Sequence, residues 1–469
     1  MFRRRQLKWQ SSAGRRSLFR TKGRGSGAIH LPASTLKRTP VIRPKPRTMR
    51  VAATPSAHSP RRVGARRRRG IALALTNALL ACGIAFFWPA AMGTVEHSRN
   101  QIWGIDKGVV KESVGRHVLN NEYPPSLMLP TLPGKPARVS YHIDSALQGA
   151  VVAQLEKYRP DYGMVVALDA ETGKILAMAD IRRDGEDHDN LALSASYPAA
   201  SVFKTVTAAA AIDLGEVKAS TVLPYNGKST TLYKKNVLSH RNNKWTRHDT
   251  LEESFSRSVN TVFARLGVFT VGGDRLKDYS ERFQFNQPFD TDIPLQVSTI
   301  EMDPNEEWSI AETASGYTRG TNISPVHGAL LAATIVNDGM MPAPQLVDVI
   351  TDEYGIILFE PQPVEAHPVI KPETAREMRK LMRETVRSGS ARKPFRGFNK
   401  RFENVEVGGK TGSLTGFHPK GKYDWFVGYA TDGERKIAYA ALCINKEYWY
   451  VKSSYLARQL IESYFSETG

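Results

Sequence analysis

The amino-acid sequence predicts an α+β protein. We expect an antiparallel β-sheet flanked by helices, with an inserted all-helical lobe, preceded by one transmembrane helix. Strand-like patterns gather at both ends of the segment 138–469, whereas helical patterns fill its middle. A separate stretch, 70–95, contains no charged residue and is long enough to cross a bilayer as a helix.

The first 69 residues have the composition of a disordered tail. Residues 1–70 contain 21 of the 65 Lys and Arg residues and no Asp or Glu, so the net charge of +19 comes from this end of the chain. Cations scattered among Ser, Pro, Gly and Ala cannot bury enough apolar surface to offset the entropy of ordering the chain. Nucleic-acid binding through phosphate contacts is the competing interpretation, and the uncharged stretch that follows disfavours it.

The stretch 70–95 is expected to be a single membrane anchor. Four arginines at 66–69 precede it, and the first acidic residue, Glu96, follows it. The positive-inside rule therefore places the tail in the cytoplasm and residues 96–469 outside. The residues before Cys82 resemble a lipoprotein processing site, but the chain stays apolar after Cys82, which favours an uncleaved anchor.

Residues 96–137 are polar and proline-containing, which is typical of an extracytoplasmic linker, and 138–469 reads as one domain. The chain has only two cysteines, Cys82 in the anchor and Cys443 near the C-terminus. They lie in different compartments, so we expect no disulfide between them and expect Cys443 to be a buried small apolar residue.

The elements of this domain follow from apolar periodicity and from caps, such as Asp144 before the first helix and Pro372 near the start of a later one. Helices are predicted over 144–158, 198–213, 251–267, 325–339, 371–386 and 455–465. A hairpin is predicted over 163–180, and further strands over 405–414, 424–431 and 435–445.

The helical stretch YPAASVFKTVTAAAA (197–211) is almost entirely small or apolar, yet Lys204 follows Ser201 by three residues. Residues at this spacing share one helix face, so the amine can reach the hydroxyl. Burial among apolar residues would lower the lysine pKa and make a neutral amine that can deprotonate the serine. The S-x-x-K pattern alone is weak, because it occurs a second time at Ser34 and Lys37, and an N-cap serine with a snorkelling lysine explains one such pair equally well.

Two further patterns give this pair its significance. Ser258 and Asn260 form S-x-N, and Lys410, Thr411 and Gly412 form K-T-G, in that order after Ser201. Taken alone, the S-x-N residues would be interpreted as turn or cap residues, and the K-T-G residues as part of a surface hairpin. The three patterns together, with the surrounding text SFSRSVNTVFARLG and GGKTGSLTG, resemble the transpeptidase domain of the penicillin-binding proteins. The resemblance covers about 140–467.

The resemblance implies a penicillin-binding D,D-transpeptidase that cross-links peptidoglycan stem peptides ending in D-Ala-D-Ala and that is inhibited by β-lactams. Ser201 would form the acyl-enzyme, Lys204 would be its base, and Ser258 would relay a proton to the leaving nitrogen. Asn260 would steady Lys204 and bind the substrate backbone. A second set of residues would bind the substrate. Lys410 and Thr411 would hold its carboxylate, and Gly412 would allow its close approach. The backbone N–H groups of Ser413 and Ser201 would form the oxyanion hole.

The resemblance also implies a bacterial inner-membrane protein with its catalytic domain in the periplasm. Only about 40 residues separate the anchor from the domain, so we expect no glycosyltransferase domain and no pedestal, and a separate glycosyltransferase is a candidate partner. The alternatives are a D,D-carboxypeptidase, a class D-like β-lactamase or penicillin sensor, and a non-catalytic scaffold. Asn260 argues against the class D-like proteins, which usually have S-x-V as the second motif.

We expect no cofactor and no metal, because the eleven histidines show no H-x-x-x-H pattern or Cys/His cluster. His418 reads as a solvated loop residue after the K-T-G strand. Asp424 and Trp425 read as structural parts of the next strand.

Overall fold

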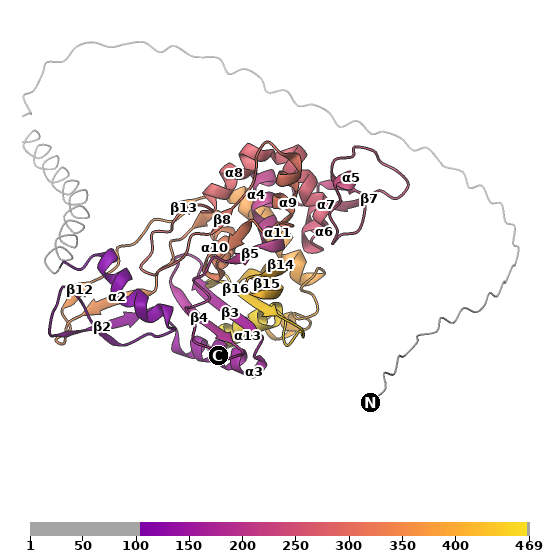
Figure 1. Cartoon of the computed structure of the whole chain (residues 1–469). Coiled ribbons are helices and arrows are strands. Elements are labelled where there is room, and N and C mark those ends of the chain that lie inside the picture. The colour runs from indigo at the N-terminus through magenta and orange to yellow at the C-terminus, as the bar shows by residue number, and fades with distance from the viewer. Residues whose placement is uncertain (1–103, 467–469) are drawn as a thin grey trace, which may run out of the picture. The chain divides into compact units, whose positions relative to one another are not determined.

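The computed structural model describes residues 104–466 (Figure 1). The predicted tail 1–69, the predicted anchor 70–95 and residues 96–103 lie outside the described residues, so these predictions stay predictions. Among the helices of residues 104–466, none is long and apolar enough to cross a membrane.

A five-stranded antiparallel sheet organises the domain (Figure 1). Its strand order is β14-β15-β16-β3-β4, so the first and last parts of the domain pair side by side, as predicted. The strands are β3 (Tyr162–Asp169), β4 (Ile175–Arg182), β14 (Glu406–Phe417), β15 (Lys420–Thr431) and β16 (Lys436–Asn445). Strand β14 is an edge strand of this sheet.

The sheet is buried on both faces. In the central strand β16, Ala438, Ala440, Leu442 and Ile444 belong to one apolar cluster, whereas Ile437, Tyr439, Ala441 and Cys443 belong to another. This alternation follows the two-residue period of a strand, with both faces apolar because helices cover each of them. Cys443 is free and fully buried, as expected, and burial raises the pKa of its thiol.

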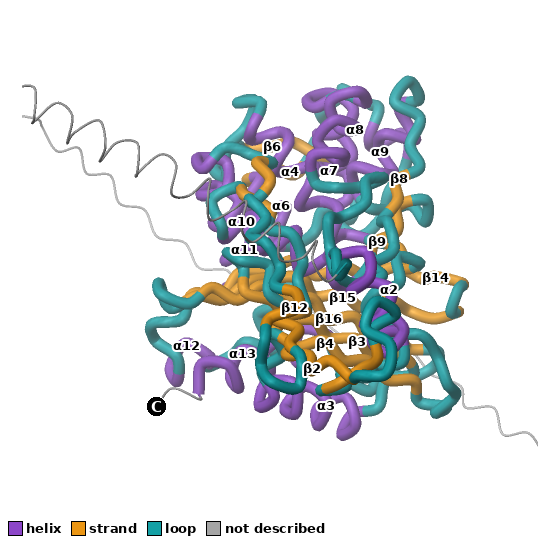
Figure 2. The backbone as a smooth tube through the Cα atoms, turned by 90° about the vertical axis from the view of Figure 1, so that its left-hand side faces the viewer, coloured by secondary structure: helices purple, strands orange, loops and turns teal. Residues whose placement is uncertain are grey.

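Different helices cover the two faces of the sheet, as Figure 2 shows. Helices α3 (Ser145–Tyr158) and α13 (Ser453–Ser466) pack on one face, and α10 (Pro325–Val336) packs on the other. Helix α11 (Pro372–Arg387) lies against β14, and the short α12 (Phe398–Arg401) lies between them in sequence. The side chain of Asp144 accepts hydrogen bonds from the N–H groups of Ala146 and Leu147, which confirms the predicted cap of α3.

The helical lobe is inserted between β4 and β14. Its helices are η1 (Ala200–Phe203), α4 (Lys204–Asp213), α5 (Lys234–Val237), α6 (Leu251–Ser256), α7 (Asn260–Arg265), η2 (Leu266–Val271), α8 (Gly273–Arg282) and α9 (Glu307–Ser315). It also contains the short strands β5 (Tyr197–Pro198), β6 (Val222–Tyr225), β7 (Arg247–Thr250), β8 (Thr299–Ile300) and β9 (Thr321–Ile323), so it is not all-helical as predicted.

Two predicted helices are interrupted. The helix expected over 251–267 is broken between α6 and α7, because Ser258 has a φ of +58° and Val259 is extended. The helix expected over 198–213 begins as the 3₁₀ turn η1 and becomes α-helical only at Lys204. Helix α10 ends at Val336, before the expected Gly339. The first two departures lie at the predicted site residues, where backbone strain often accompanies function.

The linker predicted over 96–137 differs most from the structure. Residues 104–141 contain α2 (Lys107–Leu119), β1 (Ser126–Met128) and β2 (Pro136–Tyr141), and the valines of α2 join the larger apolar cluster. In a second sheet, strand β2 pairs with β11 (Val347–Thr351), and β11 pairs with β12 (Ile357–Phe359). A separate two-stranded sheet consists of β10 (Met340–Met341) and β13 (His367–Pro368). The packed unit therefore begins well before the predicted boundary at 138, because β1 pairs with β2, and β2 pairs with β11 some 200 residues away.

Candidate active site

The turn that presents Ser201 is strained and closely packed. Ala200, just before it, has a φ of +49°, a conformation that residues other than glycine seldom adopt. A Cβ on Gly316 would lie 1.8 Å from the carbonyl oxygen of Ala200, so only glycine fits where α9 ends against this turn. Two segments over a hundred residues apart thus fix the position of the Ser201 backbone.

The amine of Lys204 lies at the centre of the site and is fully buried. Its Nζ is 2.7 Å from Oγ of Ser201 and 2.8 Å from Oδ1 of Asn260, and it also donates to the carbonyl oxygen of Ser315. Asn260 is held in turn, because its Nδ2 donates to the carbonyl oxygen of Thr230 over 3.1 Å. The structure therefore brings together Ser201, Lys204 and Asn260 from η1, α4 and α7.

A second hydroxyl–amine pair lies in the same region. Nζ of Lys410 on β14 donates to Oγ of Ser258 over 2.9 Å and to the carbonyl oxygen of Thr411 over 3.0 Å. Lys410 is also fully buried, under the ring of Phe255. The bend at Ser258, with its positive φ, turns that hydroxyl toward β14.

Both amines have depressed pKa values. Burial, and secondarily the positive charge of Lys410, holds the pKa of Lys204 well below its usual value of 10.5. Burial alone lowers the pKa of Lys410 from 10.5 to about 7. Burial therefore favours the neutral form of Lys204, and Lys410 stands close to the point where it gains or loses its proton at neutral pH.

A cavity of about 840 Å³ opens over these two pairs. Ser201, Ser258 and Asn260 line it on the lobe side, and Thr411, Gly412 and Ser413 line it on the β14 side. Lys204 and Lys410 do not line it, so each lysine lies behind the hydroxyl that it contacts. All eight predicted site residues are thus in one place, six at the cavity surface and two beneath it.

The glycine at position 412 also has a packing role. A Cβ there would lie 3.1 Å from side-chain atoms of both Val202 and Trp425 and 3.4 Å from the carbonyl oxygen of Ala199. The missing side chain therefore lets β14 approach η1, while Gly412 also lines the cavity, and its role in the close approach of substrate stays a prediction.

Several residues of the cavity were not anticipated. Ser390 shares a 2.6 Å hydrogen bond with the hydroxyl of Thr411, and the carbonyl of Ser315 holds Lys204. An aromatic side of the cavity comes from Tyr158, Tyr317, Tyr450 and Tyr455. Only Gly316 left a signal in the sequence, as a glycine at the end of a helical pattern.

Three further residues were read from the sequence as loop or structural residues. His418 is exposed at the turn between β14 and β15 and does not line the cavity. Trp425 is buried and its Nε1 donates to the carbonyl oxygen of Pro198, while Asp424, which also borders the cavity, accepts hydrogen bonds from Ser453. Within residues 104–466, no group of His, Cys, Asp and Glu side chains could hold a metal ion.

The sequence profile of the family described as "Penicillin binding protein transpeptidase domain" matches residues 163–462. The chain belongs to this family. Its catalytic-type patterns at 201–204, 258–260 and 410–412 all fall inside the match, as does the whole five-stranded sheet apart from its first residue.

Among named relatives of this transpeptidase-domain family, the peptidoglycan D,D-transpeptidase PbpA of Mycolicibacterium smegmatis is 27% identical over 315 residues, covering 60% of this chain and 62% of that protein. Stage V sporulation protein D of Bacillus subtilis is 26% identical over 58% of this chain and 43% of its own length. The chain thus matches less than two thirds of the length of these relatives.

Solved structures share the fold. The D,D-transpeptidase domain of a peptidoglycan glycosyltransferase from Eggerthella lenta superposes with a TM-score of 0.60 at 22% identity, covering 76% of this chain and 91% of that one. PBPA from Mycobacterium tuberculosis gives a TM-score of 0.57 at 23% identity, covering 70% of this chain and 82% of that one. These likenesses confirm the predicted combination of an antiparallel sheet with flanking helices and an inserted lobe.

Proposed function

We propose that this protein is a penicillin-binding D,D-transpeptidase that cross-links peptidoglycan stem peptides through an acyl-enzyme on Ser201. The observation that carries the proposal is the set of contacts around Lys204. A neutral amine has two N–H donors and one lone pair. Two of its neighbours, Oδ1 of Asn260 and the carbonyl oxygen of Ser315, can only accept, which leaves the lone pair for the hydroxyl of Ser201.

In the first half of the reaction, Ser201 attacks the carbonyl carbon between the two D-Ala residues. The hydroxyl gives its proton to Nζ of Lys204 as the C–O bond forms, and burial favours the unprotonated form of that amine beforehand. The backbone N–H groups of Ser201 on η1 and Ser413 on β14, both at the cavity, are the proposed donors to the oxyanion.

The second hydroxyl–amine pair serves the leaving group. Ser258 accepts from Lys410, so it can pass its own proton to the departing D-Ala nitrogen as the C–N bond breaks and take one back from the Lys410 ammonium, while Lys204 keeps the Ser201 proton until the acyl-enzyme is resolved. The terminal carboxylate is held by the hydroxyls of Thr411 and Ser413 at the cavity surface, with the charge of Lys410 behind them. An arriving carboxylate stabilises the ammonium form of Lys410, whose pKa of about 7 makes that gain available.

The setting of this reaction is also part of the proposal. A tail at 1–69 in the cytoplasm and an anchor at 70–95 would place the domain in the periplasm, beside the peptidoglycan that it modifies. A glycosyltransferase is the expected partner, since the family resemblance covers only the peptide cross-linking half of wall synthesis, and β-lactams are the expected inhibitors. A reporter fused before residue 60 should resist external protease in intact cells, and digestion there would contradict this orientation.

The chemistry is tested by labelling the purified full chain with a fluorescent penicillin. We expect a stable adduct on the wild type and on Ser34→Ala, which removes the serine of the other S-x-x-K pattern, and none on Ser201→Ala. Labelling of Ser201→Ala at the wild-type rate would refute the nucleophile. An adduct lost within seconds would instead favour a β-lactamase.

A further inference from the structure

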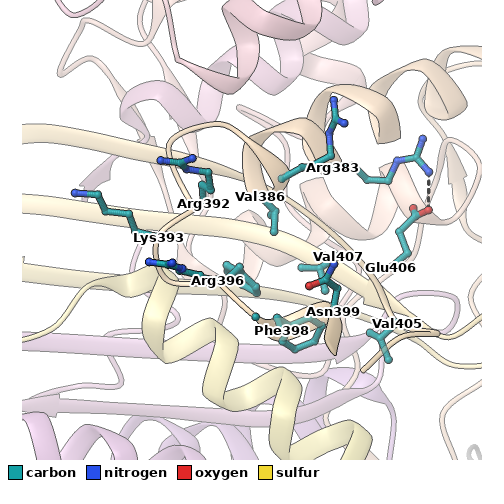
Figure 3. Close-up of a pocket in the computed structure, with 13 residues that line it drawn as sticks. Arg383, Val386, Arg392, Lys393, Arg396, Phe398, Asn399, Val405, Glu406 and Val407 are labelled. Atoms are coloured by element: carbon teal, nitrogen blue, oxygen red, sulfur yellow. Dashed lines mark hydrogen bonds and ion pairs between the residues drawn. The ribbon is translucent and has the colours of Figure 1, made fainter. Parts of the chain in front are cut away.

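A second cavity, of about 980 Å³, lies beside the candidate active site, and none of the predicted motifs accounts for it (Figure 3). The C-terminal part of α11, the segment 392–399 and the first residues of β14 line it. Its floor is apolar, since Phe395, Phe398 and Val407 are buried there. A cavity of this size can hold several residues of a peptide.

The rim of this cavity is strongly cationic. Five of its lining side chains carry positive charge: Arg383, Arg387, Arg392, Lys393 and Arg396. The one lining carboxylate, Glu406, pairs with Arg383 at 2.8 Å and accepts from Tyr429, while Arg387 pairs with Glu384 at 2.6 Å. The charges of Arg383 and Arg387 are therefore already balanced by these carboxylates.

Three cations remain on the other side of the cavity, where Figure 3 shows them together. Arg392, Lys393 and Arg396 are exposed, and among residues 104–466 no carboxylate lies within ion-pair distance of any of them. Like charges held together without counterions repel one another, so an anionic ligand is favoured at this point.

The cavity adjoins the active site on a particular side. Lys393 lines both cavities, and Ser390, three residues earlier, bonds to Thr411. Along β14 the order is Val407 in the cationic cavity, then Thr411 at the proposed carboxylate position, then Ser413 at the proposed oxyanion position. Four strand residues span about 13 Å, so a short extended peptide bridges the two.

This order places the cationic cavity on the far side of the leaving D-Ala, away from the acyl carbon. In a transfer through an acyl-enzyme, the incoming amine attacks from the place that the departing amine vacates. The C–N bond forms as the bond from the acyl carbon to Oγ of Ser201 breaks, and the amine proton returns to the serine. A second stem peptide must therefore approach across Lys393.

We propose that the cationic cavity is the subsite for the acceptor peptide, holding its free carboxylates while its amine reaches the acyl-enzyme. The inference rests on the proposed function, which makes the acceptor a second carboxylate-bearing stem peptide. Arg392 and Arg396 select this acceptor through charge, and the apolar floor accommodates the rest of its chain.

The test compares two fates of one acyl-enzyme, hydrolysis and transfer to an amine. The full chain is given a D-Ala-D-Ala donor peptide with either a carboxylate-bearing acceptor peptide or the same acceptor with its carboxylates amidated. We expect Arg392→Glu/Arg396→Glu to lower the ratio of transfer to hydrolysis roughly tenfold for the charged acceptor, and far less for the amidated one. Penicillin acylation, which needs no acceptor, shows whether the site around Ser201 is intact.

The matched control is Lys400→Glu/Lys420→Glu, which makes the same charge change at exposed positions that line neither cavity. A wild-type transfer ratio in Arg392→Glu/Arg396→Glu would overturn the subsite while leaving the transpeptidase intact. Equal losses in the control variant, or weakened binding of soluble polyphosphate with an unchanged transfer ratio, would also overturn it. Absence of penicillin acylation or of any transfer in the wild type would refute the proposed function itself.

Discussion

Two cavities share the edge strand β14, and they handle positive charge in opposite ways. Around Ser201, the cations Lys204 and Lys410 are fully buried behind hydroxyls, and burial lowers their pKa values. Around Phe395, the cations stand on an exposed rim. A buried amine is useful because it can exist without its proton, whereas an exposed guanidinium is useful because it never loses its charge.

The largest effect should come from removing the buried base. Lys204→Met is expected to lower the rate of penicillin acylation at least about a thousandfold, because no other group receives the Ser201 proton. Rapid-mixing mass spectrometry measures the rate. The exposed Lys400→Met serves as the control and should acylate normally, and a Lys204→Met rate within tenfold of the wild type would remove Lys204 as the base.

A pair of glycine substitutions tests how tightly each region is packed. Gly316→Ala should cost about 3 kcal/mol or more, because the new Cβ would overlap the Ala200 carbonyl as well as occupy a φ of +63°. Gly397→Ala, at the cationic cavity, has a φ of +79° but open space around it and should cost about 1 kcal/mol. Urea unfolding of both variants gives the comparison, and equal losses would show that the turn at Ser201 relaxes freely.

Removing the second buried amine should stabilise the protein while it impairs catalysis. The folded pKa of Lys410, about 7, lies below its unfolded value of 10.5, so below pH 7 the folded state carries a poorly solvated charge. Lys410→Met should therefore be more stable by about 2 kcal/mol at pH 6, and the gain should shrink as the pH rises from 7 toward 10.5.

Thermal unfolding at several pH values tests whether Lys410→Met gains or loses stability. The control, Lys400→Met, should shift stability by less than about 0.5 kcal/mol at every pH. A Lys410→Met protein that is less stable than the wild type at pH 6 would show that the hydrogen bonds to Ser258 and Thr411 outweigh the cost of burying the amine.

The pH dependence of acylation distinguishes the roles of the two lysines. Above pH 7, Lys410 loses the charge that faces the substrate carboxylate, so the second-order rate with a penicillin should fall, approaching tenfold per pH unit. Lys204 must be neutral to accept the Ser201 proton, so its protonation gives the profile a rising limb. A penicillin whose carboxylate is esterified should lack the falling limb, and an identical profile for both compounds would contradict this role of Lys410.

The sequence was sufficient for the sheet, and its three ordered motifs named eight residues that the structure brings together, since strand alternation and such motifs are local signals. It was insufficient where tertiary contacts decide the backbone. Nothing near Ser258 predicts its positive φ, which arises because the loop between α6 and α7 must meet β14. The strands at 126–141 are short, and β2 is specified by pairing with distant β11.

The cationic cavity was missed for a related reason. The three cations without an ion-pair partner among residues 104–466 lie close together at 392–396, but a short basic run reads as a solvated loop, and the sequence does not show that this segment meets α11 and β14 around an apolar floor. Ser315 was missed because it contributes a backbone carbonyl, which every residue possesses. Both features depend on which segments meet, and only the folded chain shows that.

The position of Lys204 has one more consequence. Its amine touches η1, α7 and α9, so it is dehydrated only when all three have docked on α4. In a molecule with an incompletely assembled lobe, water would reach the amine, its pKa would rise toward 10.5, and the serine would lack a base. Newly made chains would then be unreactive until folding is finished, and covalent penicillin labelling would count only correctly assembled molecules.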